Sequence, residues 1–300
     1  MHHIDQGVKL MSRCGYVLYT DTGADIPFST AQQQEIKLVD FHYSVEDETR
    51  TYAFSREELF EFYSAMRNGV HVSMLPVLSE ALSRLFEAEL GLGNDVLMLT
   101  TSRYLSKTFF EAQRTRETLL LKYPKQRILL VDTLSCSIAQ AMLVFEASNM
   151  RLEGLGLDEV AQWAVKNRSY INGLLLPESM EWLRKAGLYT GGVATDVLGR
   201  RTLFNLTAKG LLRVLAKNIS IQRSLYALVE SVMRIGYSLE DQIIALAHAD
   251  APEPANELRD LLLYETGCAG VNIVPMGPIN GAYLGPGALC AAFYGSARQA

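Results

Sequence analysis

No stretch of this sequence is apolar for long enough to cross a membrane. A membrane-spanning helix needs about eighteen or more consecutive apolar residues, whereas the longest candidates here, such as Met142–Phe145 and Ile243–Ala247, have only the length of a strand. The opening residues Met1–Asp5 also lack the cationic end and the apolar stretch of a signal peptide. We therefore expect a cytoplasmic protein that does not span a membrane.

Cysteine is scarce, and its spacing is irregular. The chain has four cysteines with no C-x-x-C pair among them, namely Cys14, Cys136, Cys268 and Cys290. This spacing is typical of reduced, buried thiols rather than of a disulfide framework or a zinc site. His2 and His3 stand side by side, but two histidines alone make a poor metal site. No metal is predicted.

Positive charge is also in short supply. The net charge is −5, and the 28 basic residues are scattered along the chain. The densest cluster, within Gly199–Arg201, is too short for a nucleic-acid footprint. We expect no nucleic-acid partner.

The common catalytic motifs are missing. Gly281–Gly287 is glycine-rich but has no G-K-[ST] ending, so it is not a phosphate-binding P-loop. The sequence contains neither G-x-S-x-G nor H-E-x-x-H. Asp21-Thr22-Gly23 spells the aspartic-protease triplet, but that chemistry needs two such loops facing each other. No catalytic residue and no cofactor is predicted.

What the chain does have is enough apolar residues for two cores and a regular alternation of elements. It is 300 residues long and 49% hydrophobic. In the first half, Val96–Thr100 and Ile128–Val131 are continuous apolar runs of strand length, each followed by a polar loop and a long helical pattern. Such runs indicate strands covered on both faces, as in a parallel sheet. The fold class is therefore α/β.

Local signals place further elements in the first half. Tyr16–Tyr19 is a predicted strand, and Ser79–Leu90 is a predicted helix that follows a loop at 71–77. Ser55-Arg56-Glu57-Glu58 has the S-x-x-E form of a capping box and predicts the start of another helix.

The second half begins after a predicted connecting helix at Leu157–Asn167. Its expected strands are Ile171–Leu176, Leu203–Leu206, Leu211–Leu215, Gln242–Ala247, Val271–Val274 and Leu289–Tyr294, and its expected helices are Glu178–Lys185, Ile221–Ile235 and Glu253–Glu265. We predict two domains joined near Arg168, with residues 14–167 in the first and 168–300 in the second.

Three loops that follow predicted strands are rich in hydroxyl groups: Thr20–Asp25, Thr100–Thr108 and Asp132–Ser137. The carboxyl ends of parallel strands share one edge of the sheet, and ligands bind there. Hydroxyls and helix N-terminal amides suit an oxyanion such as a carboxylate or phosphate. Two alternatives stay open: the residues only cap the helices that follow, or Asp21 and Asp132 do acid–base chemistry on a small molecule.

Taken in order, the loops resemble the DegV family. Thr20–Pro27 resembles T-D-S-x-x-D-[IL]-P, Ser102–Ala112 resembles S-S-x-[LI]-S-G-T-Y-x-x-A, Val131–Ser137 resembles D-S-x-x-x-S-x-G, Met180–Gly187 resembles L-x-x-L-x-x-G-G-R, and Gly277–Ala288 resembles G-x-V-I-G-x-H-x-G-P-G-A. The order and spacing of these segments, from Tyr16 to near the end of the chain, make the resemblance specific.

The resemblance implies an α/β/α N-terminal domain and a C-terminal domain with a mixed sheet. It implies a protein that is not an enzyme and that holds a long-chain fatty acid, such as palmitate, in an interdomain tunnel. Some family members present the carboxylate to a separate fatty acid kinase. The head-group residues carried over are Ser73 and Ser106, with Ser102, Lys107, Thr108, Thr20, Asn280 and Tyr283 in the same loops.

Several positions depart from the family pattern, and most of them surround the expected head group. Tyr283 stands where the closing loop has histidine, Leu188 where the family has arginine, and Lys107 where it has the glycine of S-G-T. Tyrosine cannot supply the positive charge of an imidazolium. An alternative is therefore a divergent member with an altered ligand head group and no kinase role.

Overall fold

The computed structural model describes residues 15–46, 48–51, 55–70, 72–75, 77–189 and 199–299. Cys14, His2 and His3 lie outside these ranges. The three other cysteines are buried and unpaired, as predicted. We call the chain up to Asn167 the N-terminal half and the chain from Ile171 the C-terminal half.

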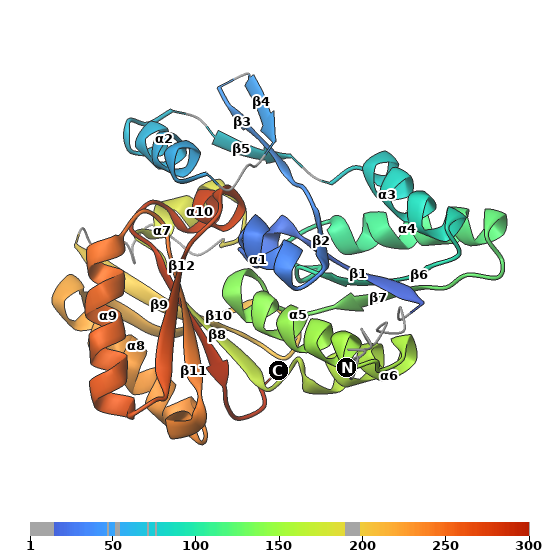
Figure 1. Ribbon diagram of the computed structural model, residues 1–300. Coiled ribbons are helices and arrows are strands. Elements are labelled where there is room, and N and C mark those ends of the chain that lie inside the picture. The colour runs from blue at the N-terminus through green and yellow to red at the C-terminus, as the bar shows by residue number, and fades with distance from the viewer. Residues whose placement is uncertain are drawn as a thin grey trace, which may run out of the picture.

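The N-terminal half contains the predicted parallel sheet, with strand order β2-β1-β6-β7. Its strands are β1 (Tyr16–Asp21), β2 (Ile36–Val39), β6 (Asp95–Thr100) and β7 (Ile128–Asp132), and its helices are η1 (Thr22–Ala24), α1 (Phe28–Gln33), α3 (Ser79–Gly91), α4 (Thr108–Lys122), α5 (Ser137–Leu152) and α6 (Leu157–Asn167). Helices α3 and α4 cover one face of the sheet, and α5 and α6 cover the other (Figure 1). Residues 96–99 are fully buried, because both faces of β6 are covered.

A small antiparallel sheet interrupts this half, and the sequence did not predict it. Its order is β4-β3-β5, with β3 (His42–Val45), β4 (Glu48–Thr51) and β5 (Val72–Leu75). The prediction of a loop at 71–77 is wrong for Val72–Leu75, which form β5. These strands are four residues long, β3 and β5 are largely half-buried and β4 is exposed, so they lack the long apolar run that reveals the central strands. The predicted helix start at Ser55 is confirmed, since the Glu58 amide donates to Ser55 Oγ at 3.1 Å at the beginning of α2 (Arg56–Arg67).

The C-terminal half contains a six-stranded mixed sheet of order β10-β9-β8-β13-β11-β12, in which only β11 and β12 pair in parallel. The strands are β8 (Ile171–Leu176), β9 (Arg200–Leu206), β10 (Leu212–Ser220), β11 (Ile243–His248), β12 (Gly270–Pro275) and β13 (Leu289–Tyr294), and the helices are α7 (Met180–Lys185), α8 (Ile221–Ile235), η3 (Leu239–Asp241), α9 (Pro252–Thr266) and α10 (Pro278–Leu284). The short helix α10 was not predicted, because prolines and glycines crowd its sequence.

Helix α5 joins the two halves. It packs on the parallel sheet and also against β8, β11 and β13 of the mixed sheet, while α8 and α9 cover that sheet's outer face (Figure 1). Most of its residues are buried. Ala139 reaches so close to β8 that a Cβ at Gly173 would lie 3.1 Å from its own. One hydrophobic core therefore runs through the contact between the halves.

Helix α2 also crosses between the halves, although it belongs to the N-terminal one in sequence. The Tyr63 hydroxyl donates to the Met276 carbonyl at 2.8 Å, and Arg67 pairs with Asp250. Helix α2 therefore packs against the C-terminal half through these two contacts. The division into domains at residue 167/168 stays a prediction.

Candidate functional site

The three hydroxyl-rich loops meet at the carboxyl edge of the parallel sheet. The Thr101 amide and hydroxyl donate to Asp21 Oδ2 and Oδ1 at 2.8 and 2.7 Å. The Ser102 amide donates to the Ser135 carbonyl at 2.8 Å. The expectation that these loops share one edge is confirmed, and their polar groups bond mainly to one another.

Thr20 and Asp21 are fully used by this internal network. Thr20 Oγ1 donates to the Leu99 carbonyl at 2.8 Å and accepts from Gln140 Nε2 at 3.0 Å. Burial raises the pKa of Asp21, and the hydrogen bonds from Thr101, Gln140 and Gly23 oppose that shift. Neither residue lines any of the five cavities described below.

The Asp132 carboxylate is likewise bonded within the protein. Its Oδ1 accepts from the Leu134 amide at 2.9 Å, and its Oδ2 pairs with Arg103 Nε at 2.5 Å. The Arg103 guanidinium also lies over the Phe109 ring, 4.4 Å from its centroid. Asp21 and Asp132 therefore hold loops in place, and neither carboxylate is free to act on a substrate.

An apolar cavity lies at the seam, where the two halves meet. Its lining residues come from both halves: Phe41, Thr101, Leu105, Ser106, Cys136, Leu175, Leu183, Leu188, Leu212, Ile279, Asn280, Tyr283 and Leu284. We call it the seam cavity. Its volume is about 30 Å³, which is close to that of one water molecule, whereas pockets for small organic ligands measure roughly 300–1,000 Å³. The seam cavity itself is thus nearly filled by its lining side chains and is too small for an acyl chain.

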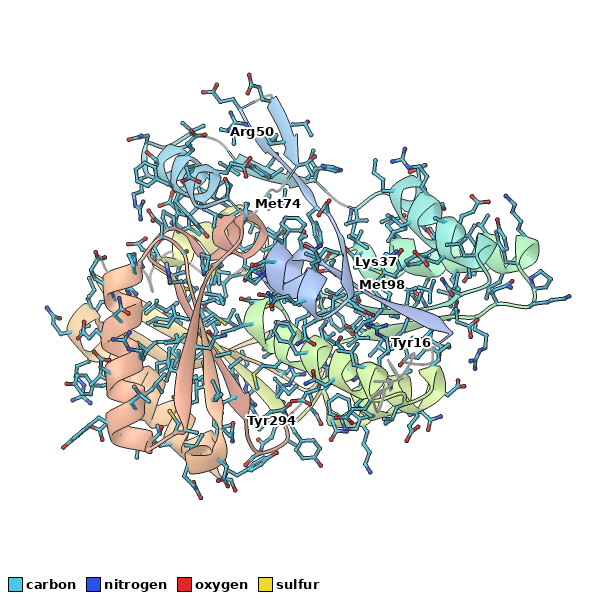
Figure 2. All side chains as sticks on the ribbon, viewed as in Figure 1. Tyr16, Lys37, Arg50, Met74, Met98 and Tyr294 are labelled. Atoms are coloured by element: carbon cyan, nitrogen blue, oxygen red, sulfur yellow. The ribbon has the colours of Figure 1, made fainter. Side chains whose placement is uncertain are left out.

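Two larger, open cavities adjoin the seam cavity. The first, of about 780 Å³, is lined by Ser106, Lys107 and Arg103 among others. The second, of about 480 Å³, is lined by Ser73 and Trp182 among others. Met74 and Tyr283 line both open cavities, and Tyr283 also lines the seam cavity. Figure 2 shows Met74 on β5, above α10. Tyr283 therefore stands where the three spaces adjoin.

The two expected head-group serines do not line the same cavity. Ser106 Oγ accepts from the Thr108 amide at 3.2 Å and lies 2.9 Å from the Thr108 hydroxyl, so it also caps α4. Ser73 Oγ lies 2.7 Å from the Ser44 hydroxyl on β3. Lys107 precedes α4 and lines the larger open cavity, whereas Thr108 is buried.

Ser102 joins the halves instead of facing a cavity. Its hydroxyl donates to the Gly210 carbonyl in the turn between β9 and β10 at 2.9 Å. Gly210 has a φ of +77°, and a Cβ there would collide with the Ser102 hydroxyl.

Asn280 and Tyr283 both project from α10. Asn280 Nδ2 donates to the Gly23 carbonyl at 2.9 Å and to Asp25 Oδ2 at 2.8 Å. Burial raises the pKa of Tyr283, so its hydroxyl stays protonated. That hydroxyl has no hydrogen-bond partner within the described ranges, which leaves it available to a ligand.

Asp25 was not among the predicted site residues, yet it fastens α10 to the first loop. It accepts hydrogen bonds from Ser137 Oγ at 2.5 Å, from the Gly277 amide at 2.8 Å and from Asn280. Burial raises the pKa of this carboxyl to about 7 in spite of these donors. The sequence signal was present, because Asp25 is the second aspartate of the T-D-S-x-x-D motif.

The family model described as "Uncharacterised protein, DegV family" matches residues 17–296 of this chain. The chain belongs to the DegV family. A DegV domain-containing protein of Clostridium perfringens is 27% identical over 288 residues, which cover 95% of this chain and 99% of that protein. No helix in the described part of this DegV-family chain is both long and apolar enough to cross a bilayer.

Solved structures of DegV-family proteins share the fold. A DegV lipid-binding protein of Thermotoga maritima matches with a TM-score of 0.80 at 22% identity, over 95% of this chain and 99% of that one. The fatty acid kinase B3 protein of Streptococcus pneumoniae, loaded with linoleic acid, matches with a TM-score of 0.81 at 19% identity, over 94% and 99%. A stearic acid-binding protein of Eubacterium ventriosum matches with a TM-score of 0.84 at 13% identity, over 93% and 98%. The predicted two-part α/β fold is confirmed.

Proposed function

We propose that this protein binds a long-chain fatty acid at the seam between its halves and performs no chemistry on it. The observation that supports this most is the seam cavity, which has apolar walls from both halves and polar groups from Ser106, Asn280 and Tyr283. Relatives with the same fold are described with linoleic and stearic acid bound.

The energetics favour a division of labour between tail and head group. Each buried CH₂ contributes about 0.8 kcal/mol, so a sixteen-carbon tail supplies on the order of 10 kcal/mol before ordering costs. A charge-assisted hydrogen bond contributes roughly 1.5–3 kcal/mol. The tail therefore provides most of the affinity, and the polar groups orient the carboxylate.

Binding requires the seam to open. A cavity of about 30 Å³ cannot admit an acyl chain, so its leucine walls have to move apart. Leu188 and Leu212 lie on the C-terminal side, opposite Leu105 on the N-terminal side. Leucine side chains make no hydrogen bonds, so their movement can leave those of Thr101, Ser106 and Asn280 in the same wall intact.

Lys107 is our candidate for the cation at the head group. Three basic residues line the larger open cavity, but Arg103 pairs with Asp132 and Arg114 pairs with Glu111 at 3.2 Å. Lys107 forms no ion pair with a carboxylate in the described part of the chain. Together with the Ser106 hydroxyl and the neutral Tyr283 hydroxyl, it would replace the charge of the family histidine.

We further propose that the bound carboxylate is presented to a separate fatty acid kinase. The support is the shared fold with the pneumococcal fatty acid kinase B3 protein. The alternative, a divergent member with another head group and no kinase role, is favoured by the presence of Tyr283 and Leu188 at family histidine and arginine positions.

The test is native mass spectrometry after mild purification, followed by palmitate titration of the delipidated protein. We expect one acyl chain per protein and submicromolar affinity. Ser106→Ala should weaken binding about tenfold by removing one charge-assisted hydrogen bond, whereas Ser29→Ala, at an exposed serine on α1, should not. A co-purifying neutral lipid with no palmitate affinity would support the divergent-member alternative, and no lipid at all would overturn lipid binding.

A further inference from the structure

A cavity in the C-terminal half, separate from the seam, collects three arginines. It measures about 330 Å³, and its polar lining comprises Asn172, Asn205, Arg213, Arg234, Ser296, Arg298 and Gln299. These residues come from β8, β9, β10, the end of α8 and the segment after β13. It shares no lining residue with the three cavities around Tyr283. We call it the arginine cavity.

No carboxylate from the described residues lines the arginine cavity. Arg213 Nε donates to the neutral Asn205 Oδ1 at 3.2 Å, directly across the β9–β10 pair. Arg234 lies in the last turn of α8, where the helix dipole favours a cation. Within the described ranges, neither arginine forms an ion pair. The cavity therefore concentrates positive charge that the protein itself does not balance.

Among the three arginines of the cavity, Arg298 has a buried nitrogen that its structural contacts do not satisfy. Its side chain belongs to a residue only 5% exposed. Two of its nitrogens donate to the Leu134 and Arg168 carbonyls, at 2.6 and 2.8 Å. Its buried Nε has no acceptor among the described residues. Leaving such a donor unpaired is costly.

Arg298 keeps its charge in this setting. Burial lowers the pKa of its guanidinium to about 10, with neighbouring Arg168 acting in the same direction. The carboxylate that opposes this shift, Asp132, is already paired with Arg103. At neutral pH three guanidinium groups therefore border the arginine cavity.

We propose that the arginine cavity binds a phosphoryl dianion, either free or carried by a small molecule. Guanidinium groups present planar pairs of N–H donors that match phosphoryl oxygens, and several of them can share one dianion. Asn205 Nδ2 and Asn172 Oδ1 add a neutral donor and a neutral acceptor for an uncharged portion, whereas the other amide atom of each is already bonded within the protein. The volume lies at the lower end of the range for small organic ligands, so there is room for more than the inorganic ion.

Isothermal titration calorimetry with sodium phosphate, and in parallel with sn-glycerol 3-phosphate, tests this proposal at matched ionic strength. We expect saturable binding of both, with the phosphomonoester at least tenfold tighter if the natural ligand is carried by a small molecule. Equal or tighter binding of inorganic phosphate identifies the free ion as the ligand. A response reproduced by sodium chloride would overturn the site.

Substitution of individual arginines tests whether they bind the anion. Arg213→Gln and Arg234→Gln should each weaken phosphomonoester binding about tenfold, because each removes a charge-assisted contact. Arg223→Gln is the matched control, since Arg223 lies on α8 but pairs with Glu230 and does not line the cavity. Unchanged affinity in the first two variants would contradict the proposal. All three variants should still bind palmitate. A failure of the anion-site proposal can therefore be distinguished from a failure of the proposed fatty-acid binding at the seam.

A third variant tests the buried arginine. Arg298→Gln should abolish anion binding, but it also removes contacts to Leu134 and Arg168, so its thermal midpoint is measured without ligand. Unchanged anion affinity in a folded Arg298→Gln protein would contradict the role of Arg298.

Discussion

The two sides of the seam differ in charge although both have apolar walls. On the side of Tyr283, the larger open cavity is lined by Arg103, Lys107 and Arg114, with Glu111 as its one acidic residue among those described. Another cavity, of about 460 Å³, lies between α1, α5 and the β11–β12 edge. We call it the acidic cavity. Figure 2 places Met74, beside the first, above α10 and Tyr294, beside the second, toward the bottom of the mixed sheet.

The acidic cavity contains Asp25, Glu146 and Asp241 and, among the described residues, no lysine or arginine. A carboxylate placed there would meet like charges in a partly desolvated space, which is unfavourable. The basic side attracts it. The proposed fatty acid therefore has a preferred polarity, with its carboxylate toward Lys107 and its tail directed into the seam.

Asp25 offers the largest expected effect, because it lines the acidic cavity and also holds α10 in place. Its pKa is raised from 3.8 to about 7 in the folded protein, so the protonated form is favoured by folding. The contribution of protonated Asp25 to the free energy of unfolding is complete below pH 4 and is lost as the pH rises through 7. The change is on the order of 4 kcal/mol. Urea unfolding of the natural chain and of Asp25→Asn, from pH 4 to 8, measures it.

Other groups also titrate over this range, so the informative quantity is the difference between the two proteins. Asp25→Asn should lose less stability with rising pH than the natural chain does. Parallel curves for the two proteins would show that Asp25 is ionised throughout and that its three donors outweigh its burial.

Gly285→Ala should destabilise the protein by about 3 kcal/mol and thereby disrupt the basic side. Gly285 ends α10 with a φ of +84° and a ψ of 156°, a conformation essentially restricted to glycine. A Cβ there would overlap the Trp182 ring. Gly270→Ala on β12 is the control, because its Cβ would meet only Ile243, at 3.7 Å. Chemical denaturation gives both values, and equal losses would contradict this account of α10.

Lys107→Glu should weaken palmitate binding about thirtyfold, or about 2 kcal/mol, because it replaces an attractive charge by a repulsive one. Glu146→Lys, the corresponding reversal in the acidic cavity, should not weaken it. Tryptophan-fluorescence or calorimetric titration at low salt measures both. A loss in Glu146→Lys with none in Lys107→Glu would reverse the proposed polarity.

The sequence predicted most of the central architecture because that architecture depends on local patterns. The continuous apolar runs of β6 and β7 and the loops that follow them mark a parallel sheet and its binding edge. The same reasoning could not tell that the side chains of Thr20, Asp21 and Asp132 are already hydrogen-bonded within the protein. That outcome depends on side chains distant in sequence, such as Gln140 on α5 and Arg103.

Other features had no sequence signal at all. The volume of the seam depends on how leucines such as Leu183 and Leu212 pack across it, and no periodicity encodes that. The arginine cavity unites Arg213, Arg234 and Arg298, which are separated along the chain and become neighbours only through the order of the mixed sheet. Departures such as Tyr283 were visible, but their consequence depends on burial.

Tyr283→Phe should weaken palmitate binding about fivefold, or about 1 kcal/mol, since it removes one neutral donor and keeps the ring between the three cavities. Tyr283→His restores the family residue and should bind more tightly at pH 6, where imidazole is charged, than at pH 8. The comparison with the natural protein isolates the imidazole, because burial keeps the Tyr283 hydroxyl protonated at both pH values, whereas Asp25, with its pKa of about 7, titrates in both proteins. If Tyr283→Phe binds as well as the natural chain while Tyr283→Ala binds more tightly, the side chain acts as a barrier between the cavities, and the head group is held by Lys107 and Ser106 alone.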